Sequence, residues 1–271
     1  MTESEVARIA AATLTRVGTD VGRPILVLHG GGGPFTVAPI VARYSSSHPV
    51  FAPTLPGWNG TARPEAADSV PTLARGYLDA LVAEGLRDVL VIGSSMGGWM
   101  AVEMAAIAGA EEGYADVIAG IAVIDGTGIE VDGETIADVF SLDARGLAEV
   151  AWFDPERGYR GPSAFTPAQL AAQRANQETM RAIAGDPFMY NPTLASRLES
   201  ITVPTSVVWG EGDAVVTPAY GRALATAIPG SDFALIARAG HLPQLERPEA
   251  LWAILDGFVS TVRSAEPRRS A

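Results

Sequence analysis

One serine of this chain stands in a pattern that could make it a nucleophile. Residues 93–97 read Gly-Ser-Ser-Met-Gly, which fits G-x-S-x-G with Ser95 at the centre. Ser94 cannot take that place, because its window would begin at Ile92 and end at Met96. A serine on a tight turn from strand to helix has an exposed side chain, and it needs small neighbours. The free N–H groups at the start of the following helix favour developing negative charge. An ordinary strand–glycine–helix turn remains the alternative.

A serine nucleophile needs a general base, and the chain offers three histidines. His29 ends an apolar run beside four consecutive glycines, and we predict that it braces this glycine loop. His48 lies in a serine-rich connection and is expected to be inert. His241 follows a predicted strand, at the end of the sheet where loops gather. His241 is therefore the favoured base.

The base must be oriented by a carboxylate. Asp213 follows a predicted strand and is the favoured acid. Asp125 ends the preceding predicted strand and stays open as the alternative, with Glu211 as a weaker third candidate. Each of them could simply be a turn carboxylate, which is common beside glycine. The chain order of serine, acid and histidine, each after a strand end, favours a catalytic group.

Apolar runs that alternate with helical patterns must position these residues. The predicted strands are residues 24–29, 49–53, 88–93, 117–125, 205–210 and 232–237. The predicted helices between and after them are residues 37–45, 71–86 and 96–109, a helix from Thr217, and residues 248–262. Residues 6–20 are expected to add one or two short strands. This alternation predicts an α/β fold with a mostly parallel sheet and helices on both faces.

The alternation is interrupted by a long segment that is rich in aromatic residues. Residues 129–200 give no strand signal, and we predict that they form a helical lid inserted after the sixth strand. One lid helix is well marked by a capping box of Thr166 and Gln169, and Gly185 stands at its expected C-terminal end. The predicted division is a core of residues 1–128 and 201–263, a lid of residues 129–200 and a polar tail of residues 264–271.

Composition and charge exclude several classes of protein. Hydrophobic residues at 48% and charged residues at 18% are typical of a packed globular protein. The net charge of −12 argues against a surface for nucleic acid or an anionic membrane. The absence of cysteine excludes disulfides and cysteine-bound metal. There is no signal-peptide pattern and no apolar run of ~18 residues, so we expect a soluble cytoplasmic protein without a membrane span.

The chain resembles the α/β-hydrolase superfamily from His29 to Glu249. His29-Gly30 matches the oxyanion loop of this family, and residues 93–98 match its nucleophile elbow. Residues 209–213 match its acid turn. Gly240-His241 matches the histidine loop, and residues 246–249 match the start of the last helix. This resemblance implies that Ser95 is the nucleophile, His241 the base and Asp213 the acid. It also implies that the N–H groups of Gly31 and Met96 form an oxyanion hole.

Two departures from the family pattern bear on specificity. Thr54 stands where the family usually has Asp before its Leu-Pro-Gly turn, and Trp58 alters that turn. Trp58 is therefore expected to line the pocket differently from the usual residue of the family at this position. The carbon–carbon bond hydrolases of the superfamily resemble this chain in the glycine loop and the Ser-Met-Gly-Gly corner. They usually carry Trp after the catalytic histidine, where this chain has Leu242.

These observations together predict a serine hydrolase for a small, largely apolar carboxylic ester or related acyl compound. It would act through an acyl-Ser95 intermediate, with no metal or organic cofactor. A carbon–carbon bond hydrolase and a cofactor-free perhydrolase stay open, as does a non-enzymatic small-molecule-binding protein of the same fold. The only partner expected is the substrate, and the oligomeric state and the identity of the substrate are left open. The residues expected to line the pocket are Gly32, Trp58, Trp152, Phe153, Phe188, Met189 and Leu242.

Overall fold

The computed structural model describes residues 5–262 and contains one seven-stranded sheet. The predicted polar tail of residues 264–271 lies outside the described residues. The strand order is β1-β3-β2-β4-β5-β6-β7, in which only β1 runs antiparallel to its neighbour. The strands are β1 (Arg16–Gly18), β2 (Ile25–Leu28), β3 (Pro49–Phe51), β4 (Val89–Ser94), β5 (Ile118–Ile124), β6 (Thr205–Gly210) and β7 (Asp232–Ile236). The predicted mostly parallel sheet is confirmed.

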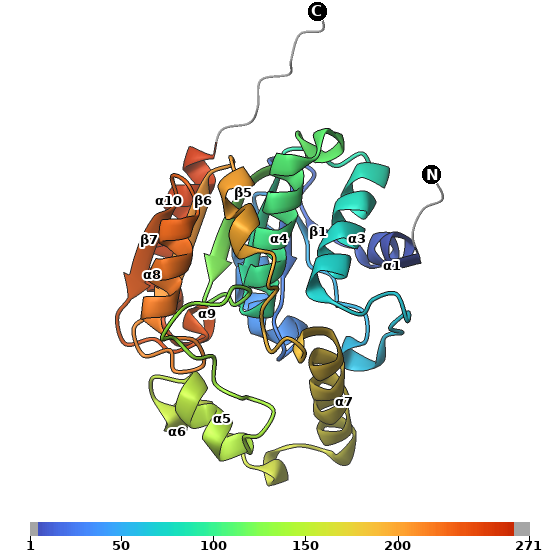
Figure 1. Cartoon of the computed structure of the whole chain (residues 1–271). Helices are drawn as coiled ribbons and strands as arrows, with labels where there is room; N and C mark the ends of the chain where they lie inside the picture. The colour runs from blue at the N-terminus through green and yellow to red at the C-terminus, as the bar shows by residue number, and fades with distance from the viewer. Residues whose placement is uncertain (1–4, 263–271) are drawn as a thin grey trace, which may run out of the picture.

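Helices cover both faces of this sheet (Figure 1). The helices α3 (Val70–Ala83), α4 (Met96–Ala110) and α8 (Pro218–Ala227) pack on one face, and α2 (Ala38–Tyr44) and α10 (Pro248–Thr261) pack on the other. Alternate side chains of β4 enter the two cores, with Val91 on the α4 side and Ile92 on the α10 side. A parallel sheet buried on both faces explains the continuous apolar runs of the sequence.

The register brings the carboxyl ends of the central strands to one edge. Ser94 of β4 pairs with Ile124 of β5, and Ile124 pairs with Val208 of β6. Gly210, at the end of β6, pairs with Ile236 at the end of β7. Residues that follow these four strands therefore meet at the same end of the sheet.

The N-terminal segment differs from the prediction. Residues Glu5–Thr13 form the helix α1, and only β1 forms in the range where up to two strands were expected. Val6 and Ala10 are buried, which places them on one side of a helix, and Val6 packs against Gly76 of α3. Helical spacing of small apolar residues therefore decides this segment. As a result, residues 129–200 follow the fifth strand along the chain, and the predicted place after a sixth strand is wrong.

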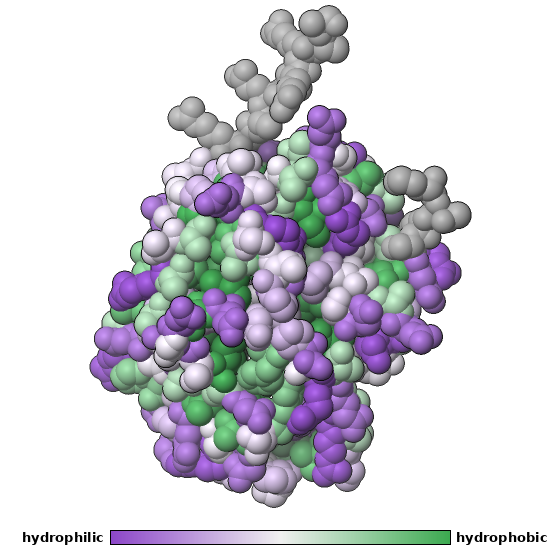
Figure 2. Space-filling model, in the orientation of Figure 1, coloured by the Kyte–Doolittle hydropathy of each residue, from purple (hydrophilic) through white to green (hydrophobic). Residues whose placement is uncertain are grey.

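Residues 129–200 are largely helical, and residues 144–184 lie beyond the carboxyl ends of the strands (Figure 1), whereas residues 195–200 return along α4. They contain α5 (Ala144–Ala151), α6 (Pro155–Gly158) and α7 (Pro167–Ala184). The capping box of Thr166 and Gln169 and the cap at Gly185 are confirmed. The outward face of α7 is hydrophilic (Figure 2). The division of the chain at residues 128/129 and 200/201 stays a prediction.

The remaining short helices lie in the connections. They are η1 (Pro34–Val37), η2 (Trp58–Gly60), η3 (Glu112–Tyr114), η4 (Pro162–Ala164), η5 (Ala195–Ser200) and α9 (Pro243–Glu246). Within residues 5–262, no helix has both the length and the hydropathy needed to cross a bilayer.

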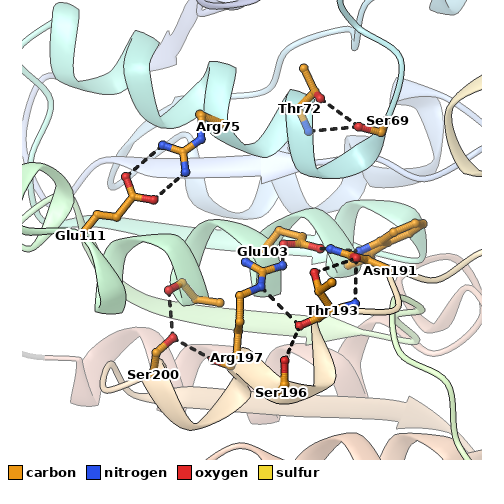
Figure 3. Close-up of polar contacts among 12 residues, drawn as sticks. Ser69, Thr72, Arg75, Glu103, Glu111, Asn191, Thr193, Ser196, Arg197 and Ser200 are labelled. Carbon is orange, nitrogen blue, oxygen red and sulfur yellow. Dashed lines mark hydrogen bonds and ion pairs between the residues drawn. The ribbon is translucent and has the colours of Figure 1, made fainter.

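A buried carboxylate fastens the end of segment 129–200 to α4 (Figure 3). Glu103 of α4 is fully buried and accepts hydrogen bonds from Trp99 Nε1 at 3.2 Å and Asn191 Nδ2 at 2.7 Å. Arg197 of η5 adds an ion pair to the same carboxylate at 2.5 Å. Three donors on one buried charge offset its desolvation. Glu103 thereby holds η5 against the core.

Candidate active site

Ser95 lies at a sharp corner between β4 and α4. Its backbone has φ 57° and ψ −125°, a region that is unfavourable for a residue with a Cβ. The corner needs a small neighbour, because a Cβ on Gly97 would overlap the carbonyl oxygen of Leu28. Such strain is typical of functional sites, where the surrounding structure maintains it. Ser95 therefore stands on the tight turn from strand to helix that the sequence predicts, and its role as a nucleophile stays a prediction.

The glycine loop after β2 passes directly beside Ser95. A Cβ on Gly30 would lie 2.7 Å from Ser95 Cβ and 3.2 Å from its Oγ, so the loop requires glycine there. Met96 is the first residue of α4, and its N–H has no partner within the helix. In the described part of the chain, Gly31 N–H also has no backbone acceptor. Neither N–H is therefore bound by a backbone acceptor within the described residues, and their role as an oxyanion hole stays a prediction.

Two side chains, His29 and Trp58, hold this glycine loop through hydrogen bonds to its carbonyl oxygens. Leu55 N–H donates to His29 Nε2 at 3.0 Å, so the ring proton lies on Nδ1, which donates to Gly30 O at 2.8 Å. Burial lowers the pKa of His29 to about 4, although the bond to Gly30 opposes this change. Trp58 is fully buried and donates its indole N–H to Gly31 O at 2.9 Å. His29 therefore has the predicted bracing role, and Trp58 shares it.

Asp213 and His241 meet at the carboxyl ends of β6 and β7. His241 Nδ1 lies 2.8 Å from Asp213 Oδ2, and both side chains are buried. The other carboxylate oxygen of Asp213 accepts the N–H groups of Val215 at 2.8 Å and Val216 at 3.1 Å. These bonds fix the direction of the carboxylate. With Nδ1 of His241 bound to Asp213, Nε2 is the ring nitrogen that could take a proton from a substrate or a nucleophile.

The alternative acids lie in different surroundings. Asp125 is fully buried after β5, and one of its oxygens lies within 4.8 Å of a ligand atom of both Asp213 and His241. Burial, followed by the charge of Asp213, raises the pKa of Asp125 well above its ordinary value. These donor types could also hold a metal ion, although Asp213 already accepts three hydrogen bonds. Glu211 accepts the N–H of Arg238 at 3.0 Å, as a turn carboxylate does.

Two polar residues of α9 join the histidine loop to its surroundings, and sequence reasoning missed both. Gln244 donates from Nε2 to Ser94 Oγ at 3.1 Å, which links α9 to the residue before Ser95. Glu246 accepts the N–H groups of Gly240 at 2.6 Å and Phe153 at 3.1 Å. Helix α9 has only four residues, so it carries no hydrophobic period that could have predicted these contacts.

The C-terminal end of α5 is bonded to the acid loop and the histidine loop. His241 N–H donates to Ala151 O at 2.8 Å, and Ala214 N–H donates to Val150 O at 3.0 Å. The next residues of the chain, Trp152 and Phe153, lie against Gly240. Segment 129–200 is therefore directly connected to both loops that carry the buried Asp–His pair.

Helix α7 makes the corresponding contacts on the glycine-loop side. Asn59 and Asn176 form two hydrogen bonds, of 2.8 Å from the N–H of Asn59 and 3.1 Å between the side chains. Thr179 Oγ1 donates to Gly57 O at 3.1 Å. Met180 packs so closely on Gly31 that a Cβ there would overlap its sulfur. Asn59, in the turn that departs from the family pattern, is thus a partner of α7.

The structure distributes the predicted pocket residues over several places. Phe153 is 43% exposed and contacts Gly212, and Trp152 packs on Gly158. Phe188 forms an edge contact with Phe140 at 5.7 Å between ring centres. The other predicted pocket residues are Trp58 and Met189, which are buried, Leu242, which is half-buried before α9, and Gly32, which is exposed. Their assignment to a substrate pocket stays a prediction.

Comparisons with known proteins identify the family to which this fold belongs. Lipase 1 of Psychrobacter immobilis is 23% identical over 84% of this chain and 74% of its own length. The 2-hydroxy-6-oxononadienedioate/2-hydroxy-6-oxononatrienedioate hydrolase of Cupriavidus pinatubonensis is 27% identical over 87% of this chain and 86% of its own length. The crystal structure of an esterase from Exiguobacterium antarcticum shares the fold, with a TM-score of 0.71 at 18% identity, over 91% of this chain and 94% of that one. The profile of the alpha/beta hydrolase family matches residues 25–254, so the chain belongs to this family.

Proposed function

We propose that this protein is a serine hydrolase in which Ser95, His241 and Asp213 form the catalytic triad. The observation that carries the proposal is the buried hydrogen bond of 2.8 Å between His241 Nδ1 and Asp213 Oδ2. It lies at the sheet edge where the strained Ser95 turn follows β4. An acid that fixes the histidine tautomer and a serine on a strained corner are the parts that acyl transfer needs.

The reaction begins when His241 Nε2 removes the proton of Ser95 Oγ as this oxygen attacks the substrate carbonyl carbon. The carbonyl oxygen takes the resulting negative charge, and the N–H groups of Gly31 and Met96 stabilise it. Collapse of the tetrahedral intermediate expels the alcohol, which receives the proton from His241, and leaves an acyl-Ser95 ester. A water molecule, deprotonated by His241, then attacks this ester; the carboxylic acid is released, and His241 returns the proton to Ser95 Oγ.

The proposed substrate class is a small, largely apolar carboxylic ester or related acyl compound. The support is the concentration of aromatic residues in residues 129–200, two of which, Trp152 and Phe153, have their backbone beside Gly240 of the histidine loop. The second candidate is hydrolysis of a carbon–carbon bond with the same triad. It is favoured by the similarity to the Cupriavidus hydrolase, which covers 87% of this chain.

Labelling with a fluorophosphonate tests the proposal directly, because only an activated serine reacts with it. We expect labelling of the wild-type protein and of Ser94→Ala, and none of Ser95→Ala. Hydrolysis of esters with short, long and ring-bearing acyl groups, beside a dienone carbon–carbon substrate, then separates the two candidate reactions. Ser95→Ala should keep only roughly 10³-fold catalysis over water.

Two other outcomes would contradict the proposal. An inactive Ser94→Ala beside an active Ser95→Ala would show that Ser94, and not Ser95, is the nucleophile. A wild-type protein that binds acyl compounds but is never labelled and never turns over would be a non-enzymatic binding protein of the same fold.

A further inference from the structure

Asp125 is a buried acid that the proposed mechanism does not use. It follows β5 with φ 47°, and its Oδ1 accepts the N–H of Gly210 at 2.8 Å. Its Oδ2 is buried and has no hydrogen-bond partner among the described residues. A buried polar atom without a partner requires an explanation, since such atoms are rare in folded proteins.

The surroundings of Asp125 are acidic. The charges of Asp213 after β6 and Glu246 of α9 act on it, and His241 after β7 has a ring nitrogen within 4.8 Å of one of its oxygens. One oxygen of Asp125 lies within 4.8 Å of an oxygen of Asp213. Two buried carboxyl groups at this separation are not both ionised, because the repulsion and the desolvation add. One of the two must therefore hold a proton.

The hydrogen bonds identify which group holds it. Asp213 accepts three hydrogen bonds, from the N–H groups of Val215 and Val216 and from His241, so both of its oxygens already act as acceptors. Asp125 accepts one, from Gly210. The proton therefore belongs to Asp125, and Oδ2 is the oxygen that is free to carry it. Burial and the charge of Asp213 both raise the pKa of Asp125, in agreement with this assignment.

We propose that Asp125 is a positioning residue whose protonated Oδ2 donates a hydrogen bond to the carboxylate of Asp213. This inference rests on the proposed function, in which Asp213 orients His241. The acid of the site is then a pair of carboxyl groups that share one proton and carry a single negative charge. The donated bond holds Asp213 in the direction that His241 requires.

Two substitutions of similar size separate this role from a structural one. Asp125→Asn keeps an acceptor for Gly210, and its amide can donate to Asp213 as the protonated acid does. Asp125→Leu removes both the acceptor and the donor. We expect kcat/KM for an ester to fall by no more than about 3-fold in Asp125→Asn and by roughly 10- to 100-fold in Asp125→Leu, the loss expected for one hydrogen bond to a charged group.

The pH profile of kcat/KM gives the decisive readout. If Asp125 is neutral, Asp125→Asn removes no charge, and the acidic limb stays in place. If Asp125 were ionised, the substitution would remove a negative charge beside His241 and move this limb to lower pH by about one unit or more. That shift would overturn the proposal. An inactive Asp125→Asn beside an active Asp213→Asn would overturn it as well, because Asp125 would then be the acid itself.

A stability measurement tests the same proton without any turnover. Between pH 4 and the raised pKa of Asp125, the folded wild-type protein holds a proton that the unfolded chain has lost, so stability falls as pH rises. The stability of Asp125→Asn lacks this decrease with rising pH, because the amide does not titrate. We expect its melting temperature, relative to wild type, to rise by at least about 2 °C between pH 4 and pH 8. A constant difference would overturn the proposal, whereas a wild type without ester hydrolysis would contradict only the proposed function.

Discussion

Glu246→Ala should weaken both the stability of the protein and the position of His241. Glu246 accepts the N–H of Gly240 at 2.6 Å and that of Phe153 at 3.1 Å, and it is almost fully buried. Alanine would leave the buried N–H of Gly240 without a partner, which costs about 1–3 kcal/mol. The N–H of Phe153 is nearer to solvent, so the loss of its hydrogen bond to Glu246 costs about 0.5–1.5 kcal/mol. The free energy of unfolding should therefore fall by roughly 1.5–4.5 kcal/mol.

The effect should reach catalysis, because Gly240 immediately precedes His241. A small displacement of a catalytic base can reduce kcat by roughly 10²-fold, since the reacting geometry is narrow. Urea unfolding gives the loss of stability, and ester hydrolysis at a temperature where the variant is folded gives the loss of kcat. Glu246→Gln is the matched control, because it keeps one acceptor oxygen and the size of the side chain. It should lose less in both measurements.

The reasoning would be refuted by an alanine variant that loses less than about 0.5 kcal/mol and keeps full kcat. Water would then accept the hydrogen bond from the N–H of Gly240 as well as the carboxylate of Glu246 does. A loss of stability with no change in kcat would refute only the link to His241. In that case Glu246 would join α5 to α9 without positioning the base.

Three further changes test other parts of the site. Asp213→Asn should reduce kcat for an ester by about 10⁴, chiefly through the wrong tautomer of His241, whereas an active variant would refute Asp213 as the acid. Trp152→Ala and Phe188→Ala should weaken kcat/KM for a long acyl ester by roughly 1–3 kcal/mol and spare a short one, and equal losses that follow the melting temperature would show a purely structural role. His29 is held neutral with its pKa lowered to about 4, so stability should fall by about 3 kcal/mol as pH decreases from 6.5 to 4. Unfolding of His29→Gln across this range should lack that slope.

The sequence predicted the parts of the fold that depend on long periodic patterns. The buried strands and the helices α3, α4 and α7 lie within a few residues of their predicted bounds. Strand ends also placed Ser95, Asp213 and His241 at one edge, because parallel strands bring their carboxyl ends together.

The remaining features depend on contacts between distant segments. Gln244 and Glu246 lie in a helix of four residues, and their partners are found only after folding. The helix α1 was missed although its Ala-rich pattern favours a helix, because the segment is short and its packing on α3 is found only after folding. The closeness of Asp125 to Asp213 follows from the register of β5 and β6, which sequence patterns do not specify.

The amide pair between Asn59 and Asn176 bears on the construction of chimeras. Asn59 has φ 52°, and both its N–H and its side chain are bonded to α7. A graft that replaced α7 alone would remove the two hydrogen bonds that Asn176 makes to this left-handed turn. Met180, on the same helix, would also be lost from its contact with Gly31. Exchange of α7 to obtain new substrate ranges should therefore carry residues 57–59 with it, so that the glycine loop beside Ser95 keeps its shape.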